Sequence, residues 1–251
     1  MPEAKQNITP TAGVAQLPIQ VHDLTYEVAA RRLVNVTQLL IEAGGPTMIL
    51  GPNGAGKSLF LRLLHGLIQP TSGDILFAGQ RADKRMRRAQ AMVFQTPVLL
   101  RRSVAANVSY ALAAHGVARR ARGPRIKELL GIGNLASRAR QPARTLSGGE
   151  KQRLAMVRAL AMQPSILFLD EPSSSLDPAA ANDIEELISA TAAGGTKIVM
   201  ITHDLGLARR RAEDVVFFHR GEVAEHCAAD RFFSDPKSGE ARAFLASKLV
   251  L

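Results

Sequence analysis

The sequence predicts an α/β fold with a mainly parallel sheet, an antiparallel β portion and an inserted helical subdomain. Short apolar runs that end in glycine or proline, such as those at 46–51 and 165–172, are typical of buried strands. Helical patterns separate these runs, as expected for strands that pair in parallel. The stretch at about 97–160 is rich in alanine and arginine and lacks a strong buried strand, which favours an inserted group of helices.

The individual elements follow in chain order. "PTMILG" (46–51) predicts a strand, and "LFLRLLHGL" (59–67) has helical spacing. "SILFLDEP" (165–172) and "TKIVMITHD" (196–204) predict two more strands, and "DVVFFHRGEVAEH" (214–226) predicts a hairpin. Further helical patterns lie at 125–130, 150–162 and 179–192. We therefore expect a flexible N-terminal tail (1–18) and a single domain (19–251), with a core of 19–96 and 161–251 and a helical subdomain at about 97–160.

Composition narrows the class of protein. Of 251 residues, 46% are hydrophobic, which allows a sizeable core. No apolar run reaches the roughly 18 residues of a membrane-spanning helix, and the N-terminus does not have the pattern of a signal peptide. The single cysteine, Cys227, excludes an intramolecular disulfide and fits a reducing compartment. The net charge of +10 suits either an ordinary solvated surface or contact with nucleic acid or anionic lipid. With two tyrosines and no tryptophan, the chain offers few aromatic side chains on which the bases of a single-stranded nucleic acid could stack.

A phosphate-binding loop follows the first predicted strand. "GPNGAGKS" matches the pattern G-x-x-x-x-G-K-[ST], in which glycines let successive backbone N–H groups face phosphate oxygens. The lysine reaches the β- and γ-phosphates, and the serine hydroxyl binds Mg²⁺. The sequence therefore predicts a P-loop NTPase core, without yet fixing the activity. The predicted nucleotide-binding residues are Gly51, Pro52, Asn53, Gly54, Ala55, Gly56, Lys57 and Ser58.

Three polar residues end the other predicted strands. Asp170 closes the strand at 165–172 and suits a role in holding Mg²⁺, while the next residue, Glu171, suits a general base for the attacking water. His203 ends the strand at 196–204, where ligands of open α/β sheets bind, and is predicted to contact the γ-phosphate. The alternative for each is a solvated or structural side chain.

The stretch "LSGGEKQR" (146–153) marks the start of a predicted helix. Ser147 is a suitable N-cap, and Gly148 and Gly149 permit close backbone approach. Backbone N–H groups and the helix dipole can together bind an anion. From the residues alone, this segment is a helix N-terminus.

The ordered set "GPNGAGKS", "VFQ", "LSGGEKQR", "ILFLDEP", "SSLD" and "ITHD" resembles the ATP-binding subunit of ABC transporters over about 21–225. The resemblance implies that Gln95 senses the γ-phosphate and Mg²⁺, and that Asp177 lies at a dimer interface. It implies that Ser147, Gly148 and Gly149 bind the γ-phosphate of ATP held by a second copy. Tyr26 would stack on adenine, although the family's usual glycine after this aromatic is absent here, and an ordinary strand residue is the alternative.

The resemblance also implies an activity. We expect ATP hydrolysis with Mg²⁺ by a homodimer on the cytoplasmic face of the membrane, coupled to a separate permease and indirectly to a substrate-binding protein, without nucleic acid. The stretch "TPVLLRRSVAANV" (96–108) is the expected docking surface; packing of Val98–Leu100 inside the domain is the alternative. Sequence similarity favours importers of tungstate or related oxyanions. An exporter ATPase and a non-transport ABC protein acting on nucleic acid or ribosomes remain as alternatives.

Overall fold

The computed structural model describes residues 16–246, so residues 1–15 of the predicted flexible tail lie outside the described residues. The chain divides into two compact units. In the described residues, one unit comprises 88–196 (the helical unit), and the other comprises 16–87 with 197–246 (the P-loop unit). The predicted subdomain at 97–160 lies inside the helical unit, and its boundaries stay a prediction.

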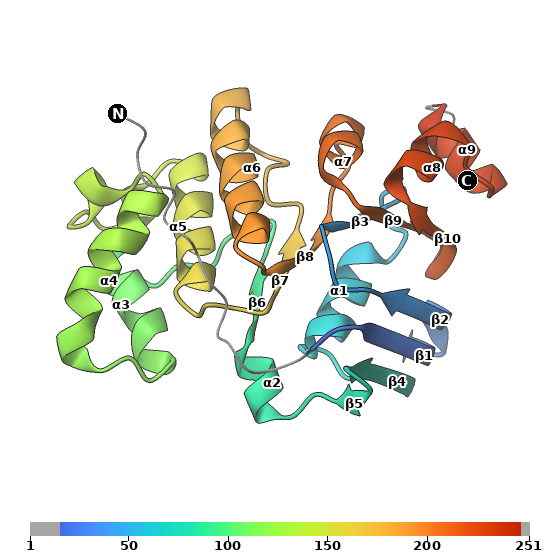
Figure 1. Ribbon diagram of the computed structural model, residues 1–251, viewed down its shortest axis with the longest axis horizontal. Coiled ribbons are helices and arrows are strands. Elements are labelled where there is room, and N and C mark those ends of the chain that lie inside the picture. The colour runs from blue at the N-terminus through green and yellow to red at the C-terminus, as the bar shows by residue number, and fades with distance from the viewer. Residues whose placement is uncertain (1–15, 247–251) are drawn as a thin grey trace. The chain divides into compact units, whose positions relative to one another are not determined.

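The P-loop unit contains two groups of strands (Figure 1). Its strands are β1 (Ile19–Val28), β2 (Arg31–Ile41), β3 (Thr47–Leu50), β4 (Ser72–Phe77), β5 (Gln80–Arg81), β8 (Lys197–Ile201), β9 (Asp214–His219) and β10 (Glu222–Ala228). One sheet is antiparallel with the order β2-β1-β4-β5. The other group has the order β10-β9-β3-β8, in which β9, β3 and β8 run parallel and β10 is antiparallel to β9. The predicted mixture of parallel and antiparallel β structure is confirmed.

Burial explains why the parallel strands were visible in the sequence. Every residue of β3 and β8 is buried, so both strands read as continuous apolar runs. The helices of this unit are α1 (Lys57–His65), α2 (Lys84–Arg88, ending just past the unit), α7 (Leu205–Arg211), α8 (Ala229–Ser234) and α9 (Gly239–Leu245). Phe60 of α1 stacks on Phe218 of β9 with ring centroids 5.1 Å apart. This contact fixes the helix that follows the phosphate-binding loop against the strand β9.

The helical unit contains one parallel strand pair and a group of helices. Its elements are β6 (Gln90–Val93), α3 (Val104–Ala114), α4 (Arg119–Ile132), η1 (Ala136–Arg138), η2 (Ala143–Thr145), α5 (Gly148–Leu160), β7 (Ile166–Asp170) and α6 (Pro178–Ala193). β6 pairs in parallel with β7, and α3, α4 and α5 pack on one another (Figure 1). Between 97 and 160 the structure has helices and one isolated bridge, Ser103 to Pro142, but no strand.

The predicted strands, helices and hairpin are all present. The hairpin pairs His219 with Glu222 and turns at Arg220 and Gly221, which have positive φ of 47° and 86°. Two left-handed residues make a turn whose twist matches that of the flanking strands. None of the helices between residues 16 and 246 is both long and apolar enough to cross a membrane.

Candidate functional site

The phosphate-binding loop joins β3 to α1 in the P-loop unit. Gly51 has φ of 144°, and a Cβ there would lie 2.0 Å from the carbonyl oxygen of Phe218, so only glycine fits. Gly54 has φ of 78° and open space where its Cβ would point. Gly56 is the N-cap of α1 with φ of 99°, and no side chain caps the helix. The loop is thus a backbone cradle at a helix N-terminus, a shape that fits phosphate groups.

Lys57 is the first residue of α1 and is held over this loop. Its side chain is buried, and Nζ donates hydrogen bonds to the carbonyl oxygens of Gly51 at 2.7 Å and Pro52 at 2.8 Å. The first turn of α1 carries no acidic residue. A cation is therefore fixed at the place where a polyphosphate would add negative charge, and the half-buried Ser58 follows it.

His203 lies at the same edge of the strands as the loop. β3 and β8 are parallel, with Met48 opposite Met200, so the segments after both strands leave at one edge. His203 is exposed there, and the next residue, Asp204, caps α7 by accepting a hydrogen bond from the Leu207 N–H. Tyr26 is half-buried in β1, at an irregularity in its pairing with β2. Nothing in its described contacts assigns it to adenine.

A polar cluster lies at the carboxyl ends of β6 and β7 in the helical unit. Val93 of β6 lies opposite Leu169 of β7, so Gln95 and the residues after β7 reach one edge. The Gln95 amide nitrogen donates to Glu171 Oε2 and to Ser174 Oγ, both at 3.2 Å. Asp170 precedes this cluster and is only 3% exposed. The structure thus brings the predicted Gln95, Asp170 and Glu171 together at one edge.

Glu171 has an unusual backbone conformation. Its φ is 47°, in the left-handed region that non-glycine residues rarely adopt. Ser174 Oγ also donates to the Glu171 carbonyl oxygen at 3.2 Å, which helps to hold this turn. Such strain is common where a side chain must be aimed for function. Sequence reasoning missed Ser174, because a serine in "SSSLD" gives no sign of which serine meets Gln95.

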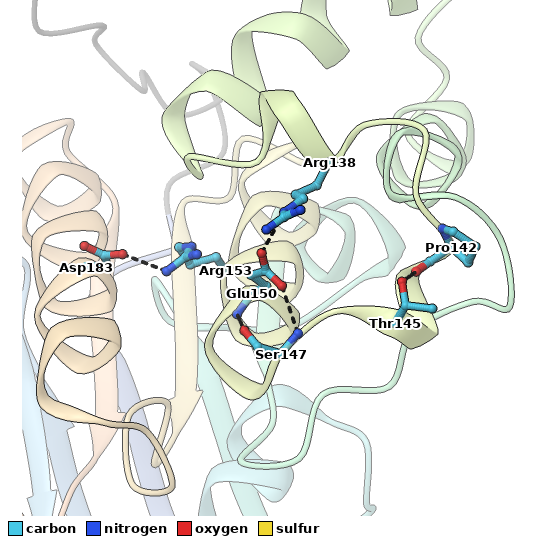
Figure 2. A network of polar contacts seen from close by, with 7 residues as sticks. All are labelled: Arg138, Pro142, Thr145, Ser147, Glu150, Arg153 and Asp183. Atoms are coloured by element: carbon cyan, nitrogen blue, oxygen red, sulfur yellow. Dashed lines mark hydrogen bonds and ion pairs between the residues drawn. The ribbon is translucent and has the colours of Figure 1, made fainter.

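The signature segment, Ser147 to Gly149, begins α5 as predicted (Figure 2). Ser147 Oγ accepts from the Glu150 N–H at 3.2 Å, and Glu150 Oε2 accepts from the Ser147 N–H at 2.8 Å, which is a complete capping box. The Ser147 N–H and Arg138 hold the pKa of the Glu150 carboxyl below its usual value. Arg138 Nε reaches Glu150 Oε1 at 3.0 Å. The role of Glu150 could have been found from the Ser-x-x-Glu spacing.

Gly149 allows α5 to pack closely against α6. A Cβ at Gly149 would lie 2.7 Å from the Cβ of Ala180, so α5 and α6 touch at this point. Arg153 and Asp183 join the same two helices by an ion pair of 2.6 Å, visible in Figure 2. Asp177 caps α6 by accepting from the Ala180 N–H at 3.0 Å. Its described contact is therefore structural, and its expected place at a dimer interface stays a prediction.

Other chemistry is not apparent in the described part of the chain. No group of three or more histidine, cysteine, aspartate or glutamate residues between 16 and 246 is arranged to hold a metal ion. Cys227 is half-buried, and burial raises the pKa of its thiol to about 11, so it is a poor nucleophile. Any Mg²⁺ would thus be held by a few oxygen ligands together with a phosphate substrate, which is how Mg²⁺ is usually bound.

Relatives of known description share most of the chain. The family described as ABC transporter matches residues 34–174. The phosphate import ATP-binding protein PstB 2 of Natronomonas pharaonis is 39% identical over 84% of this chain and 80% of its own. The tungstate uptake system ATP-binding protein TupC of Peptoclostridium acidaminophilum is 37% identical over 86% of this chain and 100% of its own. The methionine import ATP-binding protein MetN of Corynebacterium jeikeium is 38% identical over 83% of this chain, which spans only 59% of that relative.

Solved structures agree with this assignment. One described as the ATP-binding subunit of an ABC transporter has a TM-score of 0.79 and 27% identity, covering 92% of this chain and 98% of its own. Another, cbiO1 from Clostridium perfringens, part of the ABC transporter complex cbiONQ, has a TM-score of 0.78 and 27% identity, covering 88% and 92%. The predicted P-loop NTPase fold is confirmed. The chain therefore belongs to the ABC transporter family, and it is an ATP-binding ATPase subunit of the importer type.

Proposed function

We propose that the chain hydrolyses ATP to drive an importer of tungstate or a related oxyanion through a separate membrane permease. The proposal of ATP hydrolysis rests on the position of Glu171. Its carboxylate directly follows the buried Asp170, in a strained turn that Gln95 and Ser174 hold by hydrogen bonds. A carboxylate fixed in this way suits the task of accepting a proton from the attacking water.

Each unit contributes its own set of groups to the substrate. In the P-loop unit, the loop from Gly51 to Ser58 cradles the phosphates, Lys57 supplies positive charge, His203 contacts the γ-phosphate and Tyr26 stacks on adenine. Lys57 is already buried over the loop, so it loses little freedom when phosphate oxygens replace its carbonyl partners.

In the helical unit, Asp170 and Gln95 offer oxygen ligands to Mg²⁺, as Ser58 does in the P-loop unit. Mg²⁺, when bound, neutralises charge on the phosphates. Glu171 takes the proton of water and then releases it to solvent.

The signature segment acts on a second copy of the chain. The N–H groups of Gly148 and Gly149 make no hydrogen bond to any residue in the range 16–246, while Ser147 Oγ is occupied by the Glu150 N–H. Two unpaired N–H groups at the start of a 13-residue helix suit an anion. We propose that this anion is the γ-phosphate of ATP bound by the partner copy, with Asp177 near the same interface. ATP thus lies between two copies, and dimerisation is part of catalysis.

The relatives support a place at the cytoplasmic side of a membrane. They are described as ATP-binding proteins of import and uptake systems, which implies a permease and an external binding protein as partners. Val98 is 77% exposed and Leu99 and Leu100 are half-buried, so Val98 does not pack inside and the segment suits a docking surface for the permease. We propose no role for nucleic acid.

The Glu171→Gln variant tests the catalytic proposal. Glutamine keeps the shape of the side chain but cannot accept a proton at neutral pH, so hydrolysis should fall by roughly 10²-fold or more while ATP affinity stays within about threefold. Phosphate release and ATP binding are measured on the same preparations. Glu186→Gln, an exposed change on α6, is the matched control and should leave both quantities unchanged. Undiminished turnover in Glu171→Gln would show that another group is the base.

Cargo requires its own experiment. The chain copurified with its permease is assayed for ATP hydrolysis in the presence of the system's binding protein and tungstate, molybdate, phosphate or methionine. The proposal predicts stimulation by tungstate. Stimulation by phosphate or methionine, with none by tungstate, would assign the chain to one of those cargoes instead.

A further inference from the structure

The positive charge of this chain is concentrated in one stretch. Residues 97–147 contain ten lysine and arginine residues and one acidic residue, Glu128, for a local net charge of +9. The whole chain has a net charge of +10. The remaining residues are therefore close to neutral, and the excess belongs to part of the helical unit alone.

Four of these arginines line a single cavity. Its volume is about 650 Å³, and its lining comes from two short segments, 101–103 and 140–144. The lining residues are Arg101, Arg102, Ser103, Arg140, Pro142 and Arg144. A cavity of this size has room for a group bearing several phosphates or for a lipid headgroup, and no acidic side chain lines it.

Backbone hydrogen bonds hold the two lining segments together. They join the start of α3 and the residues just before it to the segment that leads into η2, and Ser103 pairs with Pro142 in an isolated bridge. The bonds are Val104 N–H to Gln141 O, Ala105 N–H to Ala139 O and Ala143 N–H to Arg102 O, each 2.9 Å. The backbone that carries the arginines is therefore already fixed, and binding of a ligand would not have to order it.

A buried asparagine fixes the first segment further. Asn107 of α3 is fully buried, and its side chain accepts from the Leu100 N–H at 2.9 Å. It also donates to the carbonyl oxygens of Leu100 at 3.2 Å and Ser103 at 3.0 Å. Asn107 thus closes the loop that carries Arg101 and Arg102.

The four guanidinium groups have no counter-charge within the part of the chain that the structure describes. None of them forms an ion pair or a side-chain hydrogen bond with a residue between 16 and 246. The nearest acids in sequence are engaged elsewhere, since Glu128 pairs with Arg125 and Glu150 pairs with Arg138. Like charges held together on a fixed frame repel one another, and an anion relieves that repulsion.

We propose that this arginine pocket binds a phosphate-bearing anion at a site separate from the P-loop. Guanidinium groups present two parallel N–H donors, which match the oxygen spacing of phosphate. The ligand is either a free polyphosphorylated molecule or the headgroup of an anionic phospholipid, and both would meet the same four side chains. The site lies in the helical unit, whereas the P-loop belongs to the other unit.

Two double variants with equal loss of charge test the proposal. Arg102→Ser/Arg144→Ser removes one arginine from each lining segment, and Arg119→Ser/Arg120→Ser removes two exposed arginines of α4 outside the pocket. All four side chains are exposed, so both variants should fold, which thermal unfolding checks. Both double variants also carry Lys57→Ala, which weakens phosphate binding at the P-loop.

Two probes separate the sources of phosphate, both at 0.15 M salt. Tripolyphosphate binding is measured by calorimetry, and vesicles of 70% phosphatidylcholine and 30% phosphatidylglycerol are tested by flotation. An arginine near an anionic surface contributes about fivefold in affinity, so loss of the pocket pair should weaken binding roughly 25-fold and loss of the control pair markedly less. If the pocket variant binds tripolyphosphate more weakly, the ligand is a free molecule. If it loses affinity for the vesicles alone, the ligand is the lipid headgroup. Absence of binding to both probes, or equal losses in the two variants, would overturn the proposal.

Discussion

Adding the same methyl group at two adjacent glycines of α5 should have opposite effects on stability. At Gly148, the new Cβ would have Leu176 Cδ2 as its nearest neighbour at 3.9 Å, an ordinary contact. At Gly149, it would lie 2.7 Å from the Cβ of Ala180 on α6. Neither glycine has positive φ, so backbone strain does not distinguish them.

The magnitudes follow from these distances. Two methyl carbons rest at about 3.5–4.0 Å, so Gly149→Ala must move α5 and α6 apart by roughly 1 Å. Such overpacking costs about 1–3 kcal/mol, against about 0.5–1 kcal/mol gained by replacing glycine within a helix. We expect Gly149→Ala to lower the free energy of unfolding by about 1–2 kcal/mol, or roughly 2–8 °C in Tm. Gly148→Ala should raise it by up to about 1 kcal/mol.

Urea and thermal unfolding of both variants measure the difference in the free energy of unfolding. A compensating substitution provides a second test. Ala180→Gly removes the methyl group that Gly149→Ala would meet, so the double variant should lose less stability than the sum of the two single variants. If Gly149→Ala were as stable as the unaltered chain, or if Ala180→Gly gave no relief, the close contact of α5 and α6 would not explain this glycine.

Three other perturbations have defined outcomes. Ala30 lies in the turn between β1 and β2 with φ of 61°, so Ala30→Gly should raise the free energy of unfolding by up to about 1 kcal/mol in a urea titration. Burial raises the pKa of the Cys227 thiol to about 11 from the ordinary value of 9.0. At pH 8 this lowers the thiolate fraction about 100-fold and raises the nucleophilicity of the thiolate about tenfold, so the reaction with a disulfide reagent should be about tenfold slower than that of an ordinary thiol, and a comparable rate would contradict the burial. Burial acts to raise the pKa of Asp214, but hydrogen bonds from His226 and Thr47 outweigh it and hold the pKa below its ordinary value of 3.8. The stability that ionised Asp214 contributes is present above pH 3.8 and is lost as the pH falls through the lowered pKa. Asp214→Asn should therefore destabilise the chain near pH 6 and lose its effect near pH 2, and a constant difference across that range would contradict the pairing.

The parallel strands and the residues that follow them could be predicted from the sequence. β3, β7 and β8 are buried on both faces, so each is a continuous apolar run, whereas the short strand β6 was not predicted. Because parallel strands place their carboxyl ends at one edge, the motifs after them also indicated which residues would gather. The grouping of Gln95 with Asp170 and Glu171 follows from that rule.

The remaining features depend on contacts between distant residues. In β1 and β2 the buried residues are separated by half-buried and exposed ones, so neither strand has a strong apolar run. Gln95 and its partner Ser174 are 79 positions apart in the sequence. Gly149 and Ala180, which meet where α5 packs on α6, are 31 positions apart. The arginine pocket likewise forms only when 101–103 and 140–144 pair through their backbones. The sequence showed the charge but not that four of its arginines would share a cavity.

The central claim is that the signature segment of one copy completes the ATP site of another. The mass of the Glu171→Gln variant in solution, measured by light scattering with and without ATP, tests it most directly, because slow hydrolysis should trap the closed dimer. The account predicts about 27.0 kDa without ATP and about twice that mass with ATP, and a return to the single mass when Ser147→Arg is added. A variant that binds ATP with unchanged affinity yet stays at the single mass would contradict the account.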